Sequence, residues 1–253
     1  MHVLGDLVGT DRRTDTLAYE RPGDRSRSYS YSSFCTDAWK AGNLMRHYGV
    51  RAGASVGIVD GPKDPEGPED MTGTPTPESL LALFGASLLG AEVRFDPPRD
   101  PDVRALVGPD AWLDRYDLPP GSKAMAYGGP PEDPTKVHFE RELWSENPIP
   151  FPEEVDPESV ALAVADEEFS HERLLSAAEA VVEEWDLGEG DRVAVDAPLT
   201  DVGTIVAGVL APLFAGGTIT VGEEGTVVVS ETQEGENVLS PTAVREAHSL
   251  GRT

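Results

Sequence analysis

Residues 170–224 read SHERLLSAAEAVVEEWDLGEGDRVAVDAPLTDVGTIVAGVLAPLFAGGTITVGEE, and their pattern of apolar residues indicates the fold class. The opening part of this stretch has apolar side chains at spacings of three and four, which predicts an amphipathic helix. A turn is expected at 186–191, a short apolar strand at 192–198, a buried helix at 201–216 and a second apolar strand at 217–224. The predicted order is therefore helix, strand, helix, strand.

The same order occurs about 137 residues earlier in the chain. The earlier elements are expected to be a helix at 31–48, a strand at 55–59, a mostly buried helix at 77–90 and a strand at 91–98. The first of these helices is expected to be capped by Ser32 or Ser33 and to end at Gly49. Such an internal repeat predicts two copies of one structural unit.

Helices that alternate with short, almost fully apolar strands are typical of parallel sheets covered on both faces. The predicted fold class is therefore α/β, with two repeated α/β lobes whose mostly parallel sheets are flanked by helices. We expect the first lobe at 1–150, with further short strands and a helix between 102 and 146, and the second lobe at 151–253. A proline-rich linker at 147–159 would join the two lobes.

An uncharged stretch, Val202–Gly222, is about long enough to span a bilayer. It contains Pro212 and a Gly-Gly pair, and its flanks are acidic, so a buried helix, a turn and a buried strand fit it better. No membrane insertion is expected. The first 15 residues lack the basic start and apolar run of a secretion signal, which favours a cytoplasmic protein.

The charge of the chain is strongly acidic, with 46 Asp and Glu residues against 20 Lys and Arg residues and a formal net charge of -26. Nucleic acid is therefore excluded as a partner, because phosphate contacts need a basic face. An acidic surface poor in lysine is tolerated in molar salt, where self-repulsion is screened. We hypothesise a high-salt cytoplasm, with an ordinary acidic protein as the alternative. The single cysteine, Cys35, is interpreted as a small core residue.

Several segments together resemble the acyl-adenylate-forming enzymes, which include acyl-CoA synthetases, luciferases and the adenylation domains of peptide synthetases. They are LAYE, SYSYSSF, GVRAGASVGIVD and TPESLLALFGASLLGAEVRFDPP between Leu17 and Pro98, then VRALVGPDAWLD, DPESVALAV and most of 169–221. The resemblance covers nearly the whole chain and implies the large N-terminal domain of these enzymes. The family activates a carboxylic acid with ATP to an acyl-adenylate and usually transfers the acyl group to coenzyme A.

The family holds the phosphates of ATP with a flexible Ser/Thr/Gly-rich loop and a lysine, because the departing pyrophosphate concentrates negative charge. In this chain the loop belongs between DPESVALAV and FSHERLL, where only Ala165-Asp166-Glu167-Glu168 stands. No lysine follows Lys136. The backbone cradle is thus expected to be missing, and no cofactor is expected.

Two residues are implied as substrate-binding by their positions in the family pattern, His171 and Asp201. His171 matches a histidine that the family often keeps beside its active site, but it can equally be a residue at the start of a helix. Asp201 stands where the family commonly has an aromatic residue or histidine, and it can equally cap the following helix. No catalytic or metal-binding residue is predicted, and the GPK sequence at 61–63 is interpreted as a turn.

The resemblance stops at Thr253, before the family's later adenylate-binding motifs and its C-terminal lobe with the catalytic lysine. The leading hypothesis is a degenerate, non-catalytic homologue that acts by binding or by pairing with a protein partner. The alternative is a partial acyl-CoA synthetase that uses ATP, Mg²⁺ and coenzyme A only with a separate complementing chain. A third hypothesis is a passive pocket for acyl groups or coenzyme A.

Overall fold

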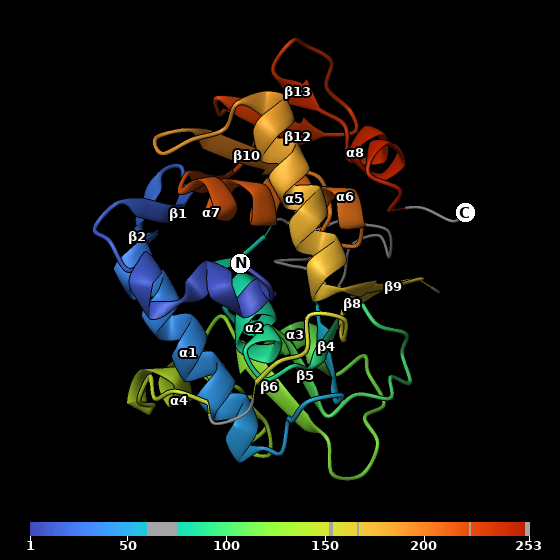
Figure 1. The fold of residues 1–253 in the computed structure, drawn as a ribbon. Helices are drawn as coiled ribbons and strands as arrows, with labels where there is room; N and C mark the ends of the chain where they lie inside the picture. Colours follow the sequence, from blue (N-terminus) through green and yellow to red (C-terminus); the bar gives the residue numbers. More distant parts are fainter. Residues whose placement is uncertain (60–74, 152–153, 166, 223, 251–253) are drawn as a thin grey trace.

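The computed structural model describes residues 1–59, 75–151, 154–165, 167–222 and 224–250. They form two sheets flanked by helices, and Figure 1 shows the N-terminal segment between the two sheets. The expected turn at 61–63 lies outside the described residues. Within the described residues, no helix is both long and apolar enough to cross a bilayer.

The first sheet has seven strands in the order β7-β6-β5-β3-β4-β8-β9. Neighbouring strands are parallel except for β9, which pairs antiparallel with β8. The strands are β3 (Ser55–Ile58), β4 (Glu92–Phe95), β5 (Ala105–Pro109), β6 (Lys123–Tyr127), β7 (Val137–His138), β8 (Val160–Val164) and β9 (Glu167–Ser170). Its helices are α1 (Tyr31–His47), α2 (Pro77–Ser87), α3 (Asp110–Leu113) and α4 (Phe139–Ser145).

The second sheet has six strands in the order β13-β12-β10-β11-β1-β2, and only β2 is antiparallel to its neighbour. The strands are β1 (Leu17–Arg21), β2 (Asp24–Ser30), β10 (Arg192–Asp196), β11 (Thr218–Val221), β12 (Val227–Ser230) and β13 (Val238–Leu239). Its helices are α5 (His171–Trp185), α6 (Val202–Ile205), α7 (Ala211–Ala215) and α8 (Pro241–Ala247). The α/β class predicted from the alternating pattern is confirmed.

The internal repeat is present in three dimensions. In each copy a helix precedes a strand, a second helical segment and a parallel neighbouring strand, as α1-β3-α2-β4 and as α5-β10-α6-α7-β11. The turns after α1 and α5 also match, because Gly49 (φ 87°) and Asp186 (φ 50°) both adopt the left-handed conformation. Val50 and Leu187 are the buried residues that follow them.

The two copies exchange their first hairpins. The β1–β2 hairpin precedes α1, yet β1 pairs with β11 of the second sheet. Likewise the β8–β9 hairpin precedes α5, yet β8 pairs with β4 of the first sheet. The sheets therefore do not follow the predicted division into 1–150 and 151–253, because each half supplies two strands to the sheet built mainly by the other half.

The apolar stretch at 202–222 forms the predicted buried helix, turn and strand. Its helix contains one π-helical segment, Val206–Leu210, between α6 and α7. Pro212 has no N–H and so cannot donate to the carbonyl of Gly208, as a regular α-helix would require. The π-helical segment therefore lies just before a residue that cannot continue the α-helical hydrogen bonds. Gly216, with φ 82°, then ends the helix before β11.

One predicted helix cap is wrong. The N-cap of α1 is Ser30, whose side chain accepts a hydrogen bond from the Ser33 backbone N–H, and not Ser32 or Ser33. The helix begins earlier because Tyr31 is itself an anchor, with its ring buried and its hydroxyl donating to the Gly217 carbonyl at 2.8 Å. Cys35 is buried in the same helix as predicted, and burial raises the pKa of its thiol to about 11.

Candidate functional site

The segment between β8 and β9, where the resemblance predicts a phosphate loop, is a tight hairpin. Strand β8 ends at Val164 and β9 begins at Glu167, and these two residues face each other across the antiparallel ladder. Only residues 165 and 166 connect them, and residue 166 lies outside the described residues. Ala165 closes the turn with a positive φ of 51°. The connection is thus a two-residue hairpin loop, a common tight connection between antiparallel strands.

The cationic side chains around this hairpin already have partners. Arg94 donates through Nη1 to the Ala165 carbonyl at 2.8 Å, and its Nη2 lies 3.6 Å from a carboxylate oxygen of Glu92. Arg173 stacks on the buried Phe169 ring, 5.0 Å from its centroid, and donates to the Ser249 carbonyl. Both guanidinium groups therefore fasten the hairpin to the rest of the protein.

His171 is the first residue of α5, as the helix-start interpretation predicted, and it is completely buried. Its Nδ1 accepts a hydrogen bond from the backbone N–H of Leu4 at 3.2 Å. A neutral imidazole that accepts at Nδ1 carries its proton on Nε2. No described residue accepts a hydrogen bond from that Nε2. His171 thus links the start of α5 to the N-terminal 3₁₀-helix, Leu4–Val8.

The burial of His171 predicts a pH dependence of stability. Burial lowers the pKa of His171 from 6.5 to about 4, although Asp6 and Asp156 act in the opposite direction. Between pH 6.5 and 4 the unfolded chain therefore binds a proton that the folded chain does not, so stability falls as the pH falls through this window. The full loss is on the order of 3 kcal/mol and is complete below about pH 4.

Comparison of the wild-type protein with His171→Asn isolates this effect, because the amide oxygen can accept from Leu4 but does not titrate. Chemical unfolding at constant salt should give a free energy of unfolding that falls more steeply in the wild type than in the variant between pH 6.5 and 4. The carboxylates contribute equally to the pH dependence of both proteins, so their effect cancels in the comparison. Parallel pH profiles would show that His171 is not held neutral.

Asp201 is the N-cap of α6, as the capping interpretation predicted. Its Oδ1 accepts from the Gly203 backbone N–H at 2.8 Å, and its Oδ2 lies 2.9 Å from Nη1 of Arg245 on α8. This ion pair joins α6 to α8 where the two helices pack so closely that a Cβ on Gly203 would lie 2.1 Å from the Pro241 carbonyl oxygen. Both carboxylate oxygens have protein partners. The substrate role suggested for Asp201 and His171 stays a prediction.

A polar cluster that the sequence did not predict lies at the carboxyl ends of β10 and β12. These neighbouring strands flank the point where the order of the second sheet reverses, which is where open α/β sheets commonly bind ligands. Asp196 Oδ2 accepts from the Ser230 hydroxyl at 3.1 Å and from Gln233 Nε2 at 2.9 Å. The sequence signal is a polar residue at the end of each apolar strand.

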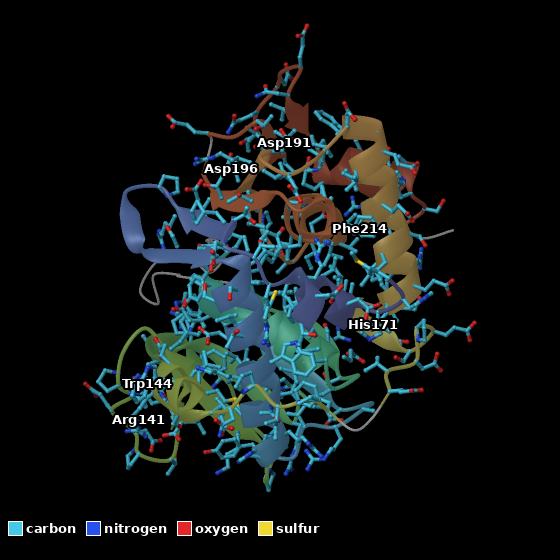
Figure 2. All side chains as sticks on the ribbon, turned by 60° about the vertical axis from the view of Figure 1, so that its left-hand side comes forward. Arg141, Trp144, His171, Asp191, Asp196 and Phe214 are labelled. Atoms are coloured by element: carbon cyan, nitrogen blue, oxygen red, sulfur yellow. The ribbon has the colours of Figure 1, made fainter. Side chains whose placement is uncertain are left out.

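The cluster around Asp196 has limited chemistry. Ser230 Oγ also accepts from the backbone N–H groups of Thr232 and Gln233, at 3.1 and 3.3 Å, so the hydroxyl is held in a closed network. Figure 2 shows Asp196 far from His171, so the imidazole does not take part in this network. In the part of the chain that the structure describes, no three His, Cys, Asp or Glu side chains are arranged to hold a metal ion. The cluster stabilises the turn after β12.

Comparison with solved structures identifies the fold. The chain matches an anthranilate CoA ligase solved with anthranoyl-AMP (TM-score 0.73, 16% identity), over 90% of this chain and 49% of the ligase. It matches the N-terminal domain of FACL13 from Mycobacterium tuberculosis (TM-score 0.70, 15% identity), over 88% of this chain and 57% of that chain. It also matches a nonribosomal peptide synthetase, FmoA3 (TM-score 0.67, 18% identity), over 87% and 22%.

These likenesses show the fold of the N-terminal domain of adenylate-forming enzymes, with two mostly parallel sheets flanked by helices. The chain spans about half the length of the anthranilate CoA ligase and of the FACL13 domain that it matches. No protein-family model matches the sequence, and no curated protein sequence matches it either.

Proposed function

We propose that this protein uses the scaffold of the acyl-adenylate-forming enzymes without activating acids, and that it acts by binding or by pairing with a protein partner. The observation that carries the proposal is the β8–β9 hairpin. A phosphate cradle needs several backbone N–H groups that point at one anion. In the hairpin the antiparallel ladder continues up to the pair Val164↔Glu167, so the N–H groups between β8 and β9 are used in the sheet and only two residues connect the strands.

The negative charge of the hairpin opposes phosphate binding, in addition to the lack of hydrogen-bond donors. Asp166, Glu167 and Glu168 place three carboxylates at or beside the turn. Two like charges about 4 Å apart repel by on the order of 4 kcal/mol at an effective dielectric constant near 20. That energy corresponds to a loss of about a thousandfold in affinity. Concentrated salt would screen part of the repulsion, but it would not supply hydrogen-bond donors.

The described lysines also have other partners. The Nζ atom of Lys136, the last lysine in the chain, lies 2.7 Å from a carboxylate oxygen of Asp110 and 2.8 Å from one of Asp114, and its side chain is 7% exposed. Lys40 pairs with Asp37, and the Nζ atom of Lys123 lies 5.9 Å from the centroid of the Tyr48 ring. These three lysines thus serve the first sheet and its helices, which supports a scaffold without the family's phosphate-binding lysine.

ATP–pyrophosphate exchange with short carboxylic acids tests the proposal. We expect no exchange above the protein-free background, in dilute buffer or in concentrated KCl. The matched variant Glu167→Gln/Glu168→Gln removes two charges while leaving the short turn in place. It should also be inactive, because the donors are still missing. Exchange by the wild type would refute the proposal, and exchange by the variant alone would show that charge, not loop length, prevents the reaction.

A second candidate is a partial acyl-CoA synthetase completed by a separate chain. Its support is the match to half of an anthranilate CoA ligase and to an isolated ligase N-terminal domain. ATP, Mg²⁺ and coenzyme A would then be bound chiefly by the other chain. This candidate requires acyl-CoA formation on mixing the two chains and none with either alone, whereas the leading proposal requires none in the mixture.

A further inference from the structure

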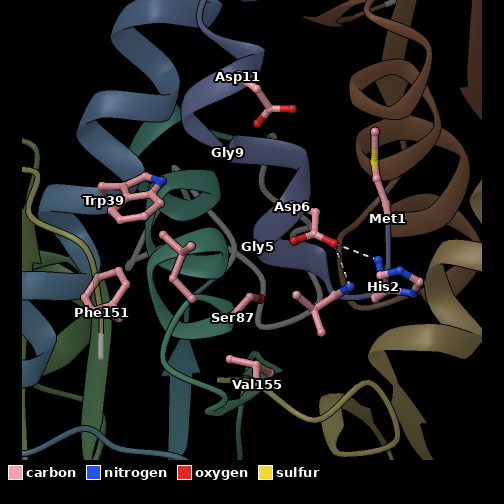
Figure 3. A pocket seen from close by; sticks show the side chains of 12 residues that line it. Met1, His2, Gly5, Asp6, Gly9, Asp11, Trp39, Ser87, Phe151 and Val155 are labelled. Carbon is pink, nitrogen blue, oxygen red and sulfur yellow. Dashed lines mark hydrogen bonds between the residues drawn. The ribbon is translucent and has the colours of Figure 1, made fainter. Parts of the chain in front are cut away.

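A hollow of about 460 Å³ lies apart from the β8–β9 hairpin and from the polar cluster around Asp196. Figure 3 shows it between the N-terminal 3₁₀-helix, α1, α2 and the segment that follows α4. The volume lies in the range of small-molecule sites in proteins. The walls come from four segments that are distant in the sequence.

One side of the hollow is apolar and aromatic. Trp39 and Phe151 stack with their ring centroids 5.4 Å apart and an interplanar angle of 25°. Leu88 and Val155 extend this wall. The polar side carries the carboxylates of Asp6 and Asp11 together with Met1 and His2, and no described lysine or arginine borders the hollow. Asp6 Oδ2 accepts from the backbone N–H of His2 at 2.6 Å.

The aromatic wall is held in place by the surrounding chain. The Trp39 indole N–H donates to the Val8 carbonyl at 2.8 Å, which joins α1 to the 3₁₀-helix. Asn43, one turn further along α1, donates to the carbonyls of Asn147 and Ile149 at 3.2 and 3.0 Å. These bonds fix the segment that carries Phe151. A ligand would thus meet a preformed wall, which lowers the entropy lost on binding.

We infer that this hollow binds an amphiphilic organic cation, an ammonium group attached to a compact apolar body. Ring faces attract cations through their quadrupole, and carboxylates attract them by charge. The net charge of -26 raises the local concentration of cations and repels anions. Carboxylic acids and phosphates, the reactants of the adenylate-forming enzymes, would be disfavoured here.

Isothermal titration calorimetry with three ligands of similar shape tests the inference. Benzyltrimethylammonium is the cation, benzyl alcohol the neutral analogue and benzoate the anion, all at one ionic strength. We expect one cation to bind per chain, at least about tenfold tighter than the alcohol, with no binding of benzoate. Equal affinity for cation and alcohol, or no binding of the cation, would overturn the inference.

Variants locate the site. Trp39→Leu removes the ring and should weaken cation binding about tenfold. Trp39→Phe keeps a ring and loses only the bond to Val8, so it should bind nearly as the wild type does. Asp11→Asn should weaken binding about two- to fivefold, since the carboxylate is exposed. The matched control Asp15→Asn, an exposed aspartate outside the hollow, should have no effect. Unchanged binding by folded Trp39→Leu would place the cation elsewhere.

Discussion

Fragments 1–150 and 151–253 are expected to remain unfolded when each is produced alone and to fold when mixed. Each fragment carries a hairpin that belongs to the sheet of the other. Without β8–β9, strand β4 loses its neighbour on one side, and without β1–β2 the same happens to β11. The fully buried side chains Tyr19 and Phe169 would lose the cores into which they pack.

The loss is large compared with the stability of a domain. Removing one buried aromatic side chain from a core costs about 3–5 kcal/mol. A whole hairpin adds ladder hydrogen bonds to that loss, and domains are stable by only about 5–15 kcal/mol. Circular dichroism and size-exclusion chromatography should report disordered single fragments and a folded 1:1 complex.

A shortened fragment supplies the control for this experiment. Fragment 171–253 lacks β8–β9 and should not complement 1–150, although 151–253 should. Cooperative unfolding of 151–253 alone would show that the second sheet folds without β1–β2. The exchanged hairpins would then be an attachment between two independent domains.

Transfer from molar KCl to dilute buffer is expected to destabilise the protein strongly. Its formal charge is -26, and on α5 the exposed Glu179 and Glu183 stand one turn apart. The Debye length is about 3 Å at 1 M salt and about 30 Å at 0.01 M, so the like charges repel only in dilute buffer. The loss should be several kcal/mol, comparable with the whole stability of about 5–15 kcal/mol.

Urea unfolding at a series of KCl concentrations measures this dependence. The matched variant Glu179→Gln/Glu183→Gln should have a higher unfolding midpoint than the wild type in dilute buffer, and the difference should shrink in molar KCl. An unfolding midpoint that is independent of KCl would remove the high-salt hypothesis. The protein would then be an ordinary acidic protein.

The repeated helices and strands could be predicted because their signals are local. Apolar spacing in 31–48 and 170–185 gives the helices, and short apolar runs such as 192–198 give the strands. The hairpin exchange could not be predicted in this way. The pattern of β1 shows that the strand is partly buried, but it carries no signal for a partner about 200 residues later in the chain.

The candidate sites follow the same distinction. The short connection Ala165-Asp166 between two apolar segments is visible in the sequence. Asp201 is also visible there as a candidate cap, because it stands directly before an apolar helical stretch. The partners of these residues, such as Arg245 on Asp201, depend on how α6 and α8 meet. The hollow beside Trp39 is harder still to predict, because four separate segments must come together to form it.

A two-residue turn between β8 and β9 offers a polyphosphate no set of donors, and calorimetry of ATP binding with Mg²⁺ in concentrated KCl, where the repulsion is screened, measures this. We expect no saturable binding of ATP or pyrophosphate at millimolar concentration and no rise in melting temperature. Saturable binding of ATP to the protein alone would contradict this expectation.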